Sequence, residues 1–182
     1  SKYAPRSVLK AEANASIEDF IEMLAEVISK SGMDHIVFLH DDGERIKKDP
    51  DEQVDKTYIR YKIVSRKPLR ERKPTVRDDE IREIGVDRNE QRRVRISAQR
   101  FTSIIQFDIL SVNYKQNTED MNFLEDVIFS YLHYFKRRGI REIVFEAQKT
   151  DEALDVYRER FSVKSLQYLI ETEKQYVSFE DI

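Results

Sequence analysis

Apolar residues recur at helical spacing in two stretches of the chain. The first begins at Ser16, where Asp19 three positions later completes a capping-box pattern, and it ends near Gly32. The second begins at Thr118 and ends before Gly139, with acidic residues in its first turn and basic residues in its last. Its apolar stripe consists of Met121, Leu124, Val127, Ile128, Tyr131, Leu132 and Phe135. Each pattern predicts a helix that packs one face against a sheet.

Other stretches have the short apolar runs or the alternation that is typical of strands. They are residues 35–39, 57–65, 93–112, 140–145 and 163–172. Within residues 93–112 the apolar side chains change from even to odd positions near Gln99 and Arg100, which predicts a bulge, bend or turn there. The pattern of residues 151–161 fits either a short helix or an ordered loop.

This order of elements predicts an α+β fold with a mixed, mainly antiparallel β-sheet and two main helices packed on it. The expected order is α-β-β-β-α-β-β, in a single domain over residues 1–182. Three segments lie outside the regular pattern: an N-terminal arm (1–13), an extended loop insertion (66–92) and a C-terminal tail (174–182). A connection of more than about 15 residues is usually functional or disordered.

The long charged loop insertion carries a cluster of basic residues, namely Lys67, Arg70, Arg72 and Lys73. The cluster fits contact with an anionic partner, but acidic residues follow it closely, and these mixed signs favour a solvated insertion of mixed charge. The C-terminal tail places Tyr176 and Phe179 among acidic residues. These two side chains could dock on a neighbouring subunit or on the chain's own core.

Composition narrows the class of protein. Charged residues make up 37% of the chain, the formal net charge is −3, and there is no cysteine. Disulfides and thiolate metal sites are therefore excluded, and contact with nucleic acid would need a local basic patch. No apolar run approaches the roughly 18 residues that cross a bilayer, so we expect a soluble protein made in a cytoplasm, without membrane partners.

The chain has few signs of catalytic chemistry. Its three histidines, His35, His40 and His133, lack the spacing of a metal site, and its glycines are isolated rather than gathered in a phosphate loop. We therefore expect no enzyme activity and no cofactor or metal. One enzyme alternative remains. Asp108, with Glu146 and Gln148, superficially resembles the acid and the E-x-K/Q pair of restriction-endonuclease-like nucleases, whose carboxylates hold Mg²⁺. Gln148 replaces the usual lysine, although Lys149 is adjacent.

The chain resembles the tail terminator and tail-completion proteins of tailed bacteriophages. The resemblance lies in residues 100–109 (RFTSIIQFDI), in the helix with Glu125, Asp126 and Tyr131, and in residues 139–145 (GIREIVF) and 165–168 (SLQY). It implies a structural virion protein that forms a homo-oligomeric ring, commonly a hexamer, made in the host cytoplasm. Such a ring caps the tail tube and joins it to the head-side connector or neck proteins, near the DNA in the channel.

The resemblance also directs attention to surfaces. Lateral contacts between subunits are expected at Phe123 and Phe129, on the outer side of the second helix, and at the terminal segments with Tyr176 and Phe179. The loop insertion with its basic cluster is expected to contact the tail tube or the lumen. Another neck or baseplate adaptor protein, without ring symmetry, is the structural alternative.

Overall fold

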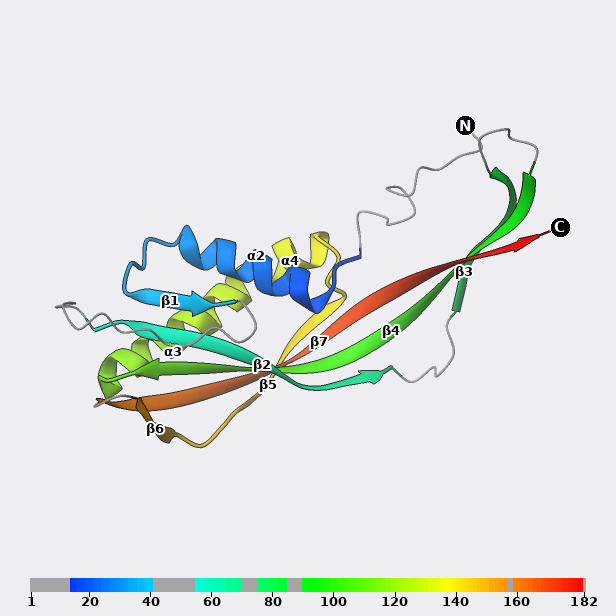
Figure 1. Cartoon of the computed structure of the whole chain (residues 1–182). Coiled ribbons are helices and arrows are strands. Elements are labelled where there is room, and N and C mark those ends of the chain that lie inside the picture. Colours follow the sequence, from blue (N-terminus) through cyan, green and yellow to red (C-terminus); the bar gives the residue numbers. More distant parts are fainter. Residues whose placement is uncertain (1–13, 41–54, 70–74, 85–89, 157–158, 182) are drawn as a thin grey trace.

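The computed structural model describes residues 14–40, 55–69, 75–84, 90–156 and 159–181, with side chains outside 75–84, 90–94 and 177–181. One twisted sheet carries helices on one face, and two of its strands continue far beyond the helices (Figure 1). The fold is α+β with a mixed and mainly antiparallel sheet, which confirms the predicted class. The predicted N-terminal arm (1–13) lies outside the described residues.

The described residues form a seven-stranded sheet whose central order is β1-β2-β4-β7-β5. The strands are β1 (Ile36–Leu39), β2 (Thr57–Pro68), β3 (Thr75–Ile84), β4 (Glu90–Ser111), β5 (Glu142–Gln148), β6 (Glu152–Val156) and β7 (Glu159–Asp181). β3 pairs with the first half of β4, and β6 pairs with the start of β7. Because β4 and β7 are antiparallel, β3 and β6 lie at opposite ends of the sheet. β1 is parallel to β2, and the other pairs are antiparallel.

The first helix, α2 (Ile17–Ser29), begins as predicted. Ser16 Oγ accepts a hydrogen bond from the Asp19 backbone N–H at 3.1 Å, and Asp19 Oδ2 accepts one from the Ser16 N–H at 2.9 Å. This reciprocal pair satisfies two donors that the first turn leaves free. Past the end of the helix, Gly32 adopts a φ of 78°, a region that favours glycine.

The second helix begins earlier than predicted and is interrupted. Asn113, not Thr118, caps α3 (Tyr114–Ser130), and its Oδ1 accepts a hydrogen bond from the Gln116 N–H at 3.0 Å. Asparagine caps a helix at least as well as threonine, so propensity also permits the earlier start. The helix breaks at Tyr131 and resumes as α4 (Leu132–Arg137), followed by Gly139 at φ 109°.

The helices cover one face of the sheet, which we call the helical face. Phe20 of α2 and Phe135 of α4 meet edge to face, with ring centroids 5.0 Å apart. The strands contribute the buried residues Ile59, Ile105, Phe107, Ile109, Ile143, Leu166, Tyr168 and Ile170. Neighbouring residues in a strand point to opposite sides, so Tyr58 and Leu110 lie on the other side, the open face, in a smaller apolar cluster with Phe161.

β4 and β7 are paired without a register shift from Arg92 with Asp181 to Ser111 with Ser162. Their inner halves belong to the core, whereas their outer halves extend away from the helices and carry β3 (Figure 1). We call this extension, made of β3, residues 90–100 of β4 and residues 172–181 of β7, the β-arm.

The β-arm corrects two sequence-based predictions. The described part of residues 66–92 is mostly strand rather than extended loop, because β2 continues to Pro68, β3 spans Thr75–Ile84 and β4 begins at Glu90. Residues 174–181 are not a separate tail but the end of β7. Strands in such a ribbon are stabilised by pairing with their neighbours, which does not require a regular apolar pattern. Residues 152–156 likewise form strand β6 rather than a helix or loop.

Near Gln99 and Arg100, where the sequence predicted a bulge, bend or turn, the strand has neither a bulge nor a turn. Ile96 and Ala98 are buried on the open face, whereas Ile105 and Phe107 are buried on the helical face, in a strand with an unbroken register. The change of parity therefore reflects a change in which face is covered. The register shifts between the described strands lie elsewhere, between Ile63 and Ser65, Val76 and Asp78, and Phe145 and Ala147.

Candidate functional site

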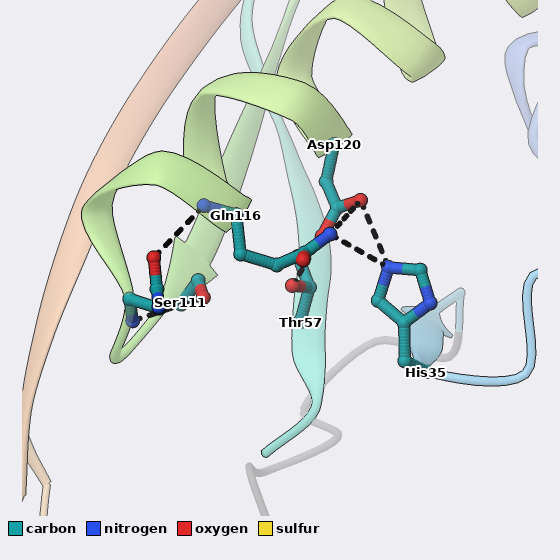
Figure 2. Close-up of polar contacts among 6 residues, drawn as sticks. His35, Thr57, Ser111, Gln116 and Asp120 are labelled. Carbon is teal, nitrogen blue, oxygen red and sulfur yellow. Dashed lines mark hydrogen bonds and ion pairs between the residues drawn. The ribbon is translucent and has the colours of Figure 1, made fainter. Parts of the chain in front are cut away.

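A buried carboxylate joins α3 to the start of β2 and to the residue before β1. Asp120 Oδ1 lies 2.9 Å from His35 Nε2 and accepts a hydrogen bond from Gln116 Nε2 at 3.0 Å (Figure 2). Its Oδ2 accepts one from the Thr57 hydroxyl at 2.5 Å. Gln116 Nε2 is also 3.1 Å from His35 Nε2. An amide nitrogen can only donate, and the carboxylate is the stronger acceptor, so donation from His35 to Asp120 accounts best for this geometry.

This cluster contains the residue types of a catalytic triad but not its arrangement. In a triad the histidine stands between the acid and the hydroxyl, so that it can remove the hydroxyl proton. Here His35 and Thr57 both donate to Asp120, and the carboxylate occupies the central place. The cluster is suited to fixing α3 against β2.

The residue central to the nuclease alternative, Asp108, is engaged in a polar row on the open face. Asp108 Oδ2 accepts a hydrogen bond from Arg60 Nε at 3.1 Å, and Oδ1 accepts bonds from Ser165 Oγ at 2.6 Å and Gln106 Nε2 at 2.8 Å. Burial raises the pKa of this carboxyl, but the three donors outweigh it, and the pKa lies below its usual value. The row links β2, β4 and β7.

The remaining residues of the nuclease alternative do not complete a metal site. Glu146 and Gln148 are exposed on β5, and Lys149 is exposed just beyond it. In the part of the chain that the structure describes, no three histidine or acidic side chains are grouped so that they could hold a metal ion. The geometry around Asp108 is that of a neutralised cross-strand contact rather than of a metal ligand.

Lys164 is a buried charge that the sequence analysis missed. Its side chain is 4% exposed, and its Nζ donates to Asp151 Oδ2 at 2.7 Å and to the Tyr114 hydroxyl at 3.2 Å. Burial lowers the pKa of Lys164, but Asp151 and Tyr114 together raise it above its usual value. Burial of Lys164 could have been predicted from the alternation of the strand, because Lys164 and the buried Leu166 lie two residues apart in β7 and so share a face.

An apolar row crosses the open face beside the polar one. Ile104 of β4 pairs with Leu169 of β7, which pairs with Val144 of β5, and Val64 is the extra residue of the β2 bulge opposite Ile104. Val64 and Val144 are 47% and 45% exposed, and the other two are half-buried. We call these four residues the open-face row. The sequence analysis missed it because each member stood alone in its own strand.

The predicted interface residues are not brought together in one place. Lys67 is exposed at the end of β2, whereas Arg70, Arg72 and Lys73 lie outside the described residues. Tyr176 is exposed in the β-arm with Lys174 over its ring, and Phe179 pairs with Val94 there, although its side chain is outside the described set.

The two aromatic residues predicted on the outer side of the second helix differ in their surroundings. Phe123 is partly buried and packs against the core of its own chain, so only part of its side chain is accessible to a neighbouring subunit. Phe129 is 79% exposed, the highest value among the exposed large apolar residues of the described chain. Tyr131, at the break between α3 and α4, is exposed beside it.

One strand and one helix carry opposite charge. β2 contains the bases Arg60, Lys62, Arg66 and Lys67 and no acidic residue. α2 contains the acids Glu18, Asp19, Glu22 and Glu26 and no basic residue. A protein with such surfaces can attract a copy of itself in a defined orientation.

Comparison with known proteins adds no relative to this picture. No protein-family model matches the chain, and no curated protein matches it significantly. None of the described helices is long and apolar enough to cross a membrane.

Proposed function

We propose that this protein is a structural component of a bacteriophage tail, a tail terminator that forms a homo-oligomeric ring. The ring would cap the tail tube and join it to the head-side neck, as the sequence resemblance implies. The observation that carries the proposal is the β-arm, in which β4 and β7 extend from the core as a pair without a change of register and carry β3. An isolated subunit gains little from such an extension, whereas a subunit in an assembly can reach its neighbour with it.

The arrangement of the polar groups supports a structural role. Asp108, Asp120 and Lys164, the buried charges nearest to a catalytic pattern, each have partners that join one element to another. Exposed apolar residues are instead found on both sides of the sheet, at Phe129 and at Val144. Surfaces of this kind are typical of subunits in an assembly.

The first experiment measures the oligomeric state. Light scattering coupled to size-exclusion chromatography gives the mass of the protein in solution. Negative-stain microscopy shows whether the particles are closed rings. We expect a ring of defined mass that stops the growth of tubes formed by the tail tube protein of the same phage. A monomer at all concentrations, with no effect on tubes, would reject the proposal.

A second experiment concerns the contact with the tail tube. Reversing the charges of Lys67, Arg70, Arg72 and Lys73 together should impair assembly with the tube. The control reverses the exposed bases Arg137 and Arg138 at the C-terminal end of α4. Equal effects of the two variants would indicate a general response to charge and remove the assigned role of the basic cluster.

A further inference from the structure

We infer that the open-face row is the contact surface for a second copy of this chain, which seats its exposed Phe129 on the row. This inference rests on the proposed ring and specifies the contact that closes it. The partner surface is the outer side of the helix layer, where Phe129 and Tyr131 are exposed. The contact is head to tail, because it joins two different surfaces of the same protein.

The open-face row has the composition of an interface centre. Its four apolar side chains come from four strands that lie next to one another, so they form one continuous strip. Polar residues border it on both sides: Gln106 with Gln167 toward the Asp108 row, and Thr102 with Glu171 toward the β-arm. An apolar centre with a polar rim is the usual anatomy of a protein interface.

Phe129 has the properties of the complementary anchor. It lies in the last turn of α3, and its side chain is 79% exposed although it is large and apolar. A few aromatic anchors commonly carry much of the binding energy in protein interfaces. Because the helices cover the opposite side of the sheet, one subunit cannot place Phe129 on its own row.

Charge complementarity identifies the partner as a second copy. Lys62 and Lys67 of β2 are exposed near the row and make no ion pair with other described residues. Asp126 is exposed one turn before Phe129, and α2 adds further acids to the same layer. Docking Asp126 and the acids of α2 on β2 places opposite charges together and favours one orientation. Repetition of such a contact closes into a ring when the rotation between subunits permits.

The test uses cysteine cross-linking, for which the natural chain offers no competing thiol. One variant carries Ser130→Cys beside Phe129, and the other carries Ala147→Cys beside the open-face row; both retain the proposed anchors. A short bis-maleimide should join the two variants when they are mixed, and neither variant to itself. A protein with both substitutions should give a ladder of multimers. Glu152→Cys, on exposed β6, replaces Ala147→Cys as the matched control.

Three further substitutions test the chemistry of the contact. Adding Phe129→Ser to the Ser130→Cys variant should lower the cross-linked yield by about tenfold, because it removes the anchor without disturbing the core. Lys62→Glu should also lower the yield, and Asp126→Lys in the partner should restore it. A loss that is not restored by the reciprocal change would contradict the assigned charge pairing.

The outcomes separate this contact from the proposed function. Rings in the wild type, with mixed cross-linking no greater than in the Glu152→Cys control, would overturn the contact and leave the ring proposal standing. A wild-type monomer without cross-linking would overturn both. Cross-linking of Ser130→Cys to itself at the yield of the mixture would indicate a two-fold contact and overturn the head-to-tail arrangement.

Discussion

Single residues that carry charge into the interior hold the elements of this protein together. Asp108, Asp120 and Lys164 have partners on other elements, and buried Glu173 accepts a hydrogen bond from Arg141 at 2.6 Å. Burying a charge is costly unless it is paired, and removing one partner leaves the other unpaired. The stability of the protein should therefore be sensitive to small polar changes at these positions.

Asp108→Asn is expected to lower the free energy of unfolding by about 1–3 kcal/mol. The asparagine side chain would have one acceptor oxygen in place of two, so it cannot replace all three hydrogen bonds that the Asp108 carboxylate accepts. Arg60 also loses its counter-ion. Urea unfolding at neutral pH measures the change. Asp155→Asn, on exposed β6, is the control and should remain within about 0.5 kcal/mol of the wild type.

The difference in stability between the wild type and Asp108→Asn should depend on pH. The folded-state pKa of Asp108 lies below its unfolded value, which is about 4. Its stabilising contribution is thus fully present above that value and is lost as the pH falls toward the lower folded-state pKa. The stability difference between wild type and Asp108→Asn should shrink on acidification below about pH 4. A difference that stays constant from neutral to strongly acidic pH would contradict this assignment.

Tyr168→Phe is expected to raise the free energy of unfolding by about 1 kcal/mol. The Tyr168 hydroxyl is buried without a hydrogen-bond partner in the described part of the chain, and its burial raises the pKa above the usual value. The ring would keep its contacts with Phe107 and Phe145. Tyr114→Phe should have the opposite sign, because that hydroxyl accepts a bond from Lys164. Thermal unfolding of both variants tests the pair.

At the scale of elements, the start of α3 decides how the helix meets the sheet. Its first turns supply Gln116 and Asp120, which contact the chain around β1 and β2. Asn113→Ala should lower stability by about 1 kcal/mol, because it removes the cap. Thr118→Ala, at the cap expected from sequence, should change it by no more than about 0.5 kcal/mol. Calorimetric melting compares them, and a larger loss for Thr118→Ala would refute the observed boundary.

The elements that sequence could predict are those with a strong local signal. The α2 capping box and the alternation of residues 57–65 each depend on neighbours in the chain, and the structure confirms both. The β-arm could not be predicted in this way, because its strands depend on pairing between residues far apart, such as Val94 with Phe179. The break at Tyr131 likewise follows no proline or glycine.

At the scale of the whole molecule, the β-arm and the body can be tested separately. Ser97 pairs with Val76 on one side and with Tyr176 on the other, so it occupies a central strand position in the β-arm. Ser97→Pro should disrupt the β-arm, since proline is excluded from such positions, and should change the melting temperature of the body by only a few degrees, about 5 °C or less. Ring assembly should be lost, whereas the control Ser97→Ala should assemble normally.

Hydrogen exchange shows whether the intended change was made. Amides of the β-arm should lose protection in Ser97→Pro while those of α2 and α3 keep it. Intact assembly of a variant with an unprotected β-arm would show that the extension is dispensable, and it would remove the observation on which the proposed function depends.

The candidate site was less accessible from sequence than the fold. Phe129 was singled out because it falls off the buried stripe of its helix, which is a local signal. The open-face row has no such signal, since Ile104, Leu169 and Val144 become neighbours only once the strand order and register are known. Phe123 also falls off the buried stripe, but it packs against the core, so the local signal alone does not identify an exposed residue.

The unbroken pairing of β4 with β7 also has a mechanical consequence. Twenty residue pairs join the two strands from the tip of the extension to the core. A pull along the strands at the tip would load their hydrogen bonds in shear, so that many must yield together rather than one after another. With no register shift between these strands to act as a hinge, a force applied to the tip would be transmitted directly to the layer beneath the helices.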